Sequence, residues 1–135
     1  MQPSLAAYGA ANCDTISRCG DEPISGASNP ATTVQYAGGA ALNVVSVFAA
    51  LGGLATLNTA LGDDAAGAFV RRSLRERSVA LNEVSCQRTG SYTAICGPDG
   101  TLALATSDMA GIEGASFGDA TGSVGWTFIE ANLCE

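Results

Sequence analysis

Two polar residues that stand two positions apart, Asn12 and Asp14, are the first side chains in this sequence whose types could bind a ligand. A carboxylate can accept two hydrogen bonds from neighbouring hydroxyl groups, and an amide can both donate and accept. The pair ends a short apolar run, residues 5–11, which is typical of a buried strand. The spacing therefore indicates a site for a hydroxyl-rich ligand, although an Asx turn that closes the strand would use the same residues.

A second group of candidates lies between Gly38 and Asn43, where two glycines stand directly before a predicted helix, residues 40–51. Glycines at a helix start let a ligand approach the backbone, and Asn43 would face the same space one turn later. The segment contains neither GxGxxG nor GxxxxGKS/T, so it matches neither the dinucleotide-binding pattern nor the P-loop. Taken alone, Gly38 and Gly39 favour a plain tight turn.

Other polar residues are weaker candidates or structural ones. Asp108 and Asn132 each follow a predicted strand, from which they could reach a substrate. Asp63 and Asp64 stand at the start of a predicted helix, residues 65–78, where acids cap the helix and stabilise its dipole. The second half of that helix carries four arginines that we interpret as a solvated face: Arg71, Arg72, Arg75 and Arg77.

The composition excludes several classes of site and partner. The chain has 135 residues and no His, which rules out a Ser-His-Asp triad, a Cys-His pair and His-based zinc sites within it. Its net charge of −7 repels phosphate backbones, so no nucleic-acid partner is expected. Five irregularly spaced cysteines predict reduced thiols. Because no apolar run approaches the roughly 18 residues of a membrane span, we expect no membrane partner and a cytoplasmic chain.

The elements that must position these residues alternate between strand and helix. After the first strand and the helix at 40–51, the sequence predicts a strand at 54–61, a helix at 65–78 and a last buried strand at 124–129. This order is typical of an α/β fold with a parallel sheet and right-handed crossovers. Ligands of such sheets bind at the carboxyl ends of the strands.

Two stretches do not belong to this predicted core of alternating strands and helices. Residues 19–37 are rich in Gly, Pro and Asn, and only 32–36 have strand character. Residues 91–95 and 101–106 flank Gly97-Pro98-Asp99-Gly100, which favours a hairpin turn. We expect this hairpin to pair with the strand at 32–36 and to form a small β-flap.

Several of these features recur together in one known family. The residues concerned are Gly39, Asn43, Gly52, Gly62, Asp63-Asp64 and Gly67. In this order they resemble the N-terminal signature of the PfkB, or ribokinase-like, carbohydrate kinases. A further set of segments resembles the pseudouridine kinase branch: Gly9-Ala10-Ala11-Asn12-Cys13-Asp14, Ser28-Asn29-Pro30, Tyr92-Thr93-Ala94, Ser107-Asp108-Met109 and Ala131-Asn132-Leu133. The resemblance covers nearly the whole chain.

The resemblance implies that residues 1–135 are the N-terminal portion of a kinase domain with a ribokinase-like parallel-sheet core, incomplete here, and a lid. The lid would consist of segments 15–37 and 86–110. It would close over a ribose pocket lined by Asn12, Asp14, Gly38, Gly39 and Asn43. Two residues depart from the family pattern, because Val45 replaces a small residue and Leu42 stands where many members have a basic one.

The resemblance also implies phosphoryl transfer from ATP, with Mg, in a complete family member. The family's GAGD anion hole, catalytic aspartate and adenine-binding loops belong to its C-terminal half and have no counterpart in this sequence, so no cofactor is expected to bind this chain alone. We therefore expect the part of a sugar or nucleoside kinase that binds a ribosyl substrate. The alternatives are a non-catalytic sugar-binding or dimerising module, with a homodimer through the lid, and a fragment without independent function.

Overall fold

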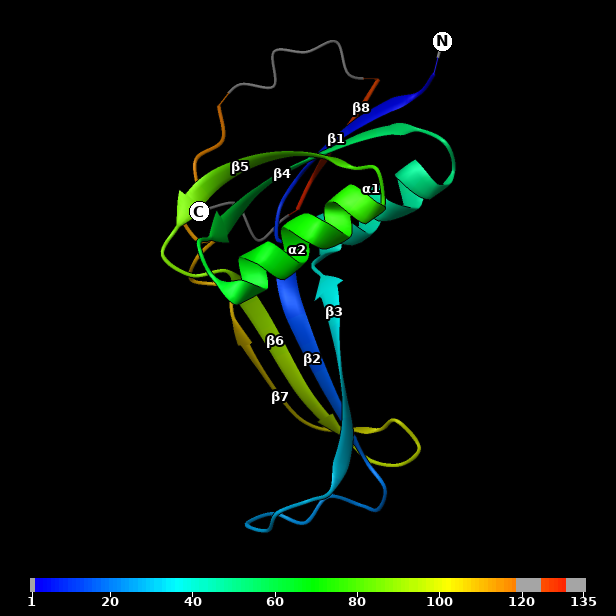
Figure 1. The fold of residues 1–135 in the computed structure, drawn as a ribbon, viewed down its shortest axis with the longest axis vertical. Coiled ribbons are helices and arrows are strands. Elements are labelled where there is room, and N and C mark those ends of the chain that lie inside the picture. The colour runs from blue at the N-terminus through cyan, green and yellow to red at the C-terminus, as the bar shows by residue number, and fades with distance from the viewer. Residues whose placement is uncertain (1, 119–124, 131–135) are drawn as a thin grey trace.

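The computed structural model describes residues 2–118 and 125–130, which form two four-stranded sheets and two helices (Figure 1). The core sheet has the order β5-β4-β1-β8. Its strands are β1 (Ser4–Tyr8), β4 (Leu54–Gly62), β5 (Ala80–Cys86) and β8 (Trp126–Ile129). All neighbouring strands in it run parallel. This arrangement confirms the predicted α/β fold class with a parallel-sheet core.

Helices α1 (Ala40–Ala50) and α2 (Ala65–Glu76) cover the same face of the core sheet (Figure 1). Apolar side chains at helical spacing account for this packing. The largest fully buried ones are Leu42 and Val45 in α1 and Val70 and Leu74 in α2. They join the inward side chains of β1 and β4 in one apolar core.

The start of α2 confirms the capping role predicted for Asp64. Its carboxylate accepts a hydrogen bond from the backbone N–H of Gly67 at 2.7 Å. The interpretation of the arginines as a purely solvated face is wrong for Arg71. Its guanidinium forms an ion pair with Glu83 at 2.8 Å and donates to the carbonyl of Gly62 at 3.2 Å, because α2 lies directly over β5 and the end of β4.

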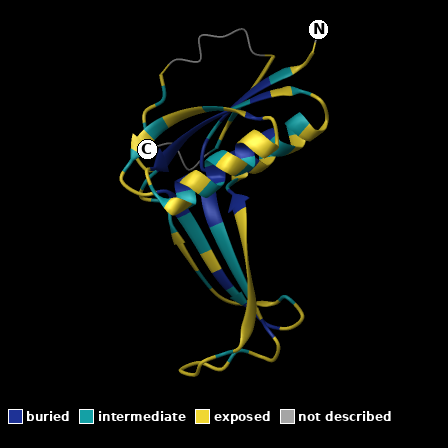
Figure 2. Ribbon diagram, viewed as in Figure 1, coloured by how far each residue is buried: buried dark blue, intermediate teal, exposed yellow. Residues whose placement is uncertain are grey.

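The second sheet, which we call the lid sheet, extends away from the core (Figure 1). Its strands are β2 (Asn12–Cys19), β3 (Ala31–Gly38), β6 (Gly90–Cys96) and β7 (Leu102–Asp108), in the order β3-β2-β6-β7. They come from residues 12–38 and 90–108, whereas the sequence predicted lid segments at 15–37 and 86–110. Figure 2 shows that β3 is exposed along most of its length.

The predicted pairing of the hairpin with residues 32–36 is wrong. Strand β6 pairs in parallel with β2, and β3 pairs with the other side of β2 in the antiparallel sense. The reason is that Asn12 and Asp14 do not end the first strand. Strand β1 already ends at Tyr8, and Asn12 begins an eight-residue strand that occupies the position between β3 and β6.

Strand β5 has no counterpart among the predicted elements. It is an edge strand of the core sheet, so most of its side chains are exposed or half-buried. Without a continuous apolar run or a clean alternation, such a strand carries little sequence signal.

Two further expectations concern cysteines and membranes. The four cysteines in the described part of the chain, Cys13, Cys19, Cys86 and Cys96, are free thiols, while Cys134 lies outside it. Among the described residues, neither helix has the length and apolar character that a membrane crossing requires.

Candidate functional site

The candidate site lies where three lid strands meet the core. Asn12 begins β2, Gly38 ends β3 and Gly90 begins β6, and the strand register places Asn12 between the two glycines. Strand β1 leads into this point through a short connection, and α1 leaves it directly after Gly39. The structure thus brings four of the predicted residues together: Asn12, Asp14, Gly38 and Gly39.

The Asn12 side chain is almost completely buried, with 3% of its surface exposed. Its amide nitrogen donates a hydrogen bond to the Asp14 carboxylate. Its amide oxygen is buried and has no hydrogen-bond partner among the described residues. A buried acceptor without a partner costs about 1–3 kcal/mol, so this oxygen is a place where a ligand hydroxyl would stabilise the protein.

Asp14 lies on the same face of β2 as Asn12, since side chains two residues apart in a strand share a face. Partial burial raises the pKa of the Asp14 carboxyl, and the hydrogen bond from Asn12 only partly offsets this effect. The carboxylate is therefore incompletely solvated. Donors on a bound ligand would replace the missing water.

Gly38 and Gly39 leave room for these two polar side chains. A Cβ atom at Gly38 would overlap the Asp14 carboxylate. A Cβ atom at Gly39 would overlap the carbonyl oxygen of Ala10 and lie 2.8 Å from the Asn12 amide oxygen. Gly39 also has φ +105°, in the region that favours glycine. The plain-turn alternative therefore does not fully account for the pair, because both glycines also accommodate the polar side chains of the site.

The first turn of α1 opens at the same place. Gly39 is its N-cap residue and offers no side-chain hydrogen bond to the helix N–H groups. The free N–H groups at a helix start carry partial positive charge and attract oxygen acceptors. Asn43 lies in this part of α1, with its backbone N–H bonded to the carbonyl of Gly39 at 2.9 Å and with an exposed side chain.

Asp108 is placed differently. The register pairs Asp108 with Ser91 and Gly90 with Asn12, so Asp108 lies on the opposite face of the lid sheet from Asn12 and Asp14. Its carboxylate forms an ion pair with Arg88 at 2.5 Å. The structure therefore does not bring it together with the other candidates. Asn132 lies outside the described residues, so its contact with substrate stays a prediction.

Glu130 is a polar residue beside the site that the sequence reasoning did not select. Its carboxylate accepts a hydrogen bond from the backbone N–H of Ala10 at 2.8 Å, and its own N–H donates to the carbonyl of Tyr8. It thereby contacts the connection between β1 and β2, two residues before Asn12. Glu130 directly follows a predicted strand, which is the feature that made Asp108 and Asn132 candidates. The sequence could therefore have indicated Glu130 in the same way.

A separate cavity of about 380 Å³ lies beside the ends of β4 and β5. Its lining includes Ala60, Val84 and the segment from Ser85 to Arg88, together with residues of 110–116. None of the predicted site residues within the described part of the chain lines it. It is therefore not the site to which the candidate residues belong.

Comparison with known proteins identifies the family. The family description "pfkB family carbohydrate kinase" matches residues 2–111. The chain belongs to this family. The comparison with curated proteins finds no match.

Solved structures agree with this assignment. A carbohydrate kinase from Agrobacterium tumefaciens is 31% identical over 82% of this chain, with a TM-score of 0.73. The fold alone is shared with two more distant proteins. They are a ribokinase from Cryptococcus neoformans in complex with ADP (21% identity, 97% of this chain, TM-score 0.72) and a fructokinase from Xylella fastidiosa with bound ATP (24%, 82%, TM-score 0.63).

This pfkB-family chain spans 36% of the Agrobacterium kinase, 41% of the Cryptococcus ribokinase and 34% of the Xylella fructokinase. The ribokinase-like fold class is confirmed. Within the described residues, no group of three or more His, Cys, Asp or Glu side chains is arranged to hold a metal ion.

Proposed function

We propose that this chain is the substrate-binding part of an ATP-dependent kinase that phosphorylates a hydroxyl of a ribosyl compound. The observation that carries the proposal is the buried Asn12 amide oxygen without a partner beside the partly desolvated Asp14 carboxylate. Both groups accept hydrogen bonds, and adjacent hydroxyls of a ribose ring could donate to both at once. The backbone N–H groups at the start of α1 would donate hydrogen bonds to the remaining ligand oxygens.

A nucleoside such as pseudouridine is the substrate that we favour within this class. Tyr36 and Tyr92 pair with Asp14 from its two sides, so two aromatic rings share the lid face that carries the carboxylate. Tyr36 is 54% exposed, which leaves its ring accessible. Aromatic rings bind the planar face of a base, which ribose alone does not have. We therefore expect tighter binding of pseudouridine than of ribose.

Calorimetric titration of the 135-residue chain with pseudouridine, uridine and ribose tests this proposal. Asp14→Ala should weaken binding of each ligand about tenfold or more, because hydrogen bonds to a charged group contribute about 1.5–3 kcal/mol. Tyr92→Leu should weaken pseudouridine binding and leave ribose binding unchanged. Asp21→Ala, which removes an exposed lid acid, is the matched control. Unchanged affinity in Asp14→Ala would overturn the assignment of the pocket.

The second candidate is a module that dimerises through its lid. Strands β3 and β7 are the edges of the lid sheet, and both carry exposed apolar side chains. These are Val34 and Tyr36 on β3 and Leu102 and Leu104 on β7. An open edge with apolar side chains can pair with the same edge of a second copy. Tyr36 belongs to both surfaces, since it also pairs with Asp14 in the register of β2 and β3.

A further inference from the structure

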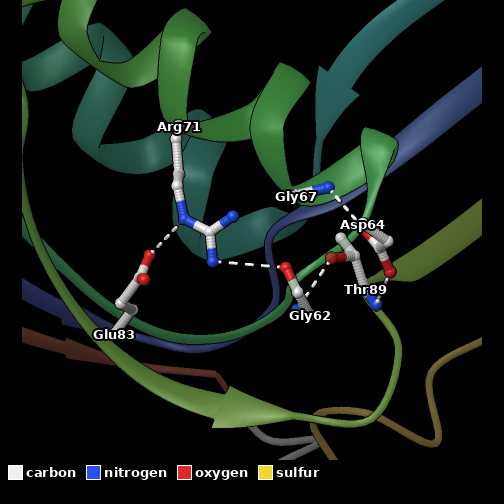
Figure 3. A network of polar contacts seen from close by, with 6 residues as sticks. All are labelled: Gly62, Asp64, Gly67, Arg71, Glu83 and Thr89. Atoms are coloured by element: carbon white, nitrogen blue, oxygen red, sulfur yellow. Dashed lines mark hydrogen bonds and ion pairs between the residues drawn. The ribbon is translucent and has the colours of Figure 1, made fainter.

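A group of hydrogen bonds ties the start of β6 to the core (Figure 3). The Asp64 carboxylate accepts hydrogen bonds from the backbone N–H of Gly67 in α2 and of Thr89 just before β6, at 2.7 and 2.9 Å. The Thr89 hydroxyl accepts a hydrogen bond from the backbone N–H of Gly62 at the end of β4, at 2.9 Å. One carboxylate and one hydroxyl thus connect a core strand, a core helix and a lid strand.

These contacts are tightly packed. Thr89 is 3% exposed. A Cβ atom at Gly62 would lie 2.8 Å from the backbone nitrogen of Thr89, and one at Gly67 would lie 2.8 Å from the Thr89 hydroxyl. Glycine at both positions therefore allows the core to approach Thr89 closely enough for the hydrogen bonds to form.

The charge of Asp64 strengthens this connection. Burial by itself raises the pKa of the Asp64 carboxyl, but the hydrogen bonds from Thr89 and Gly67 outweigh it and the pKa is lowered. The group is therefore ionised at neutral pH, and its two hydrogen bonds are charge-assisted. Asp64 also lies close enough to β2 to contribute, after burial and Asp14, to a raised pKa of the Cys13 thiol.

The connection reaches the candidate site through a single residue. Gly90 follows Thr89 and pairs with Asn12 in the register of β6 and β2. A Cβ atom at Gly90 would lie 3.3 Å from Cβ of Asn12, so the two backbones are in close contact. A shift of Thr89 would therefore move the strand that packs against Asn12.

We propose that Asp64 and Thr89 are positioning residues, which hold the start of β6 and thereby keep Asn12 in the geometry that binds the ligand. This inference rests on the proposed function, because it adds two residues to the same ribosyl site. Neither residue is among those that face the ligand. They act through the backbone of β6.

The test compares Thr89→Val with Thr89→Ser. Valine keeps the shape of threonine but removes the acceptor for the Gly62 N–H, whereas serine retains it. In Thr89→Val we expect amide hydrogen exchange in β6 to accelerate about tenfold relative to β4, and pseudouridine affinity to fall about tenfold. Thr89→Ser should restore both values. All measurements are made well below the melting temperature of each variant, so that global unfolding does not contribute.

Two control variants remove polar contacts in which neither Asp64 nor Thr89 takes part. Glu83→Gln breaks the ion pair with Arg71, which joins α2 to β5 without involving the lid. Thr33→Val removes the 2.8 Å contact with Ser17 between two lid strands, away from the start of β6. Both should leave pseudouridine affinity within about twofold of the unmodified chain. If Thr89→Val does not fold, Asp64→Asn serves instead, because the amide keeps one acceptor and loses the charge.

Unchanged exchange in β6, or faster exchange with unchanged affinity, would overturn the positioning role. The proposed function is tested separately. If the unmodified chain binds no ribosyl ligand, that function is wrong. Amide hydrogen exchange in β6 of Thr89→Val is measured without ligand. Even if the chain binds no ribosyl ligand, this measurement decides whether Thr89 holds the strand.

Discussion

The proposed binding role of the Asp14 carboxylate is combined with a cost in stability. Burial raises the pKa of this carboxyl, so the folded chain holds the proton more tightly than the unfolded chain does. Stability should therefore fall as pH rises from the ordinary value of 3.8 through the raised folded value, and then level off. A carboxylate that stabilised the fold through ion pairs or hydrogen bonds would have a lowered pKa, and stability would then rise with pH over this range. This is the pattern expected of a residue retained for a ligand.

Asp14→Asn separates these two effects. The amide oxygen can still accept the hydrogen bond from Asn12, but the desolvated charge is gone. We expect the melting temperature at pH 7 to stay equal or rise, while ribosyl affinity falls about ten- to hundredfold. Thermal melts across the acidic range and calorimetric titration measure both. A lower melting temperature at pH 7 would contradict the sign derived for Asp14.

Gly39 should tolerate a side chain less well than another glycine with positive φ. In Gly39→Ala the added methyl meets the Ala10 carbonyl and the Asn12 amide oxygen, whereas at Gly52, with φ +87°, no atom lies within 4 Å. We expect Gly52→Ala to cost about 1 kcal/mol for backbone strain. Gly39→Ala should cost about 1–3 kcal/mol more, because of the overlap, and should also lose ribosyl affinity. Urea denaturation of both variants checks this, and equal losses would argue against the close packing at Gly39.

At the scale of elements, the lid is joined to the core by strands that differ in how they are held. Hydrogen bonds of Asp64 and Thr89 hold the start of β6. Near the start of β2, the Glu130 carboxylate accepts a hydrogen bond from the backbone N–H of Ala10. Strand β3 instead continues into α1 at Gly38 and Gly39. Because glycine has no side chain, these two positions leave space for the polar groups of the site. The outer half of β3 is exposed and forms an edge of the sheet.

Val34→Lys tests pairing through the β3 edge. A lysine on an edge strand keeps a second strand from pairing, because its charge would have to be desolvated. If the lids pair, we expect sedimentation equilibrium to give twice the chain mass of 13.5 kDa for the unmodified protein and the single mass for Val34→Lys. Ala50→Lys adds the same charge on the exposed end of α1 and should leave the dimer intact. A monomeric unmodified chain would remove dimerisation from the candidate functions.

At the scale of the whole molecule, the chain spans 36% of the Agrobacterium carbohydrate kinase. We propose that Asn12, Asp14, Gly38 and Gly39 form the substrate side of a kinase site. Phosphoryl transfer also needs nucleotide contacts and groups that stabilise the transferred phosphate, held in one arrangement. Two acids near the site have other roles: Asp64 caps α2, and we propose that Asp14 binds the ligand.

We therefore predict that the purified 135-residue chain does not hydrolyse ATP and does not phosphorylate pseudouridine. A coupled assay for ADP release, with and without pseudouridine and Mg²⁺, measures this directly. The control is a mock preparation from cells without the gene. ATP turnover that is present in the chain and lost in Asp14→Ala would contradict the prediction. A second chain or an unassigned site would then have to supply the missing contacts.

The sequence by itself determined the features that depend on local order along the chain. The apolar periodicity of residues 40–51 and 65–78 predicted both helices, and the Pro98-Asp99 turn predicted the hairpin of β6 and β7. The residue types of Asn12, Asp14, Gly38 and Gly39, together with the family resemblance, were enough to select the candidate site. The same local chemistry predicted that Asp64 caps α2, because a helix cap involves only neighbours in the sequence.

Only the tertiary structure decided which distant segments meet. Whether Asn12 ends one strand or begins the next depends on pairing with Gly38 and Gly90, which lie far away in the sequence. The edge strand β5 was missed for the same reason, because its stability comes from hydrogen bonds to β4 and not from its own apolar pattern. The placement of Thr89 against Gly62, and of Asp108 on the opposite face from Asp14, likewise follows from register between strands. Register is a non-local property, so no spacing within one segment could reveal it.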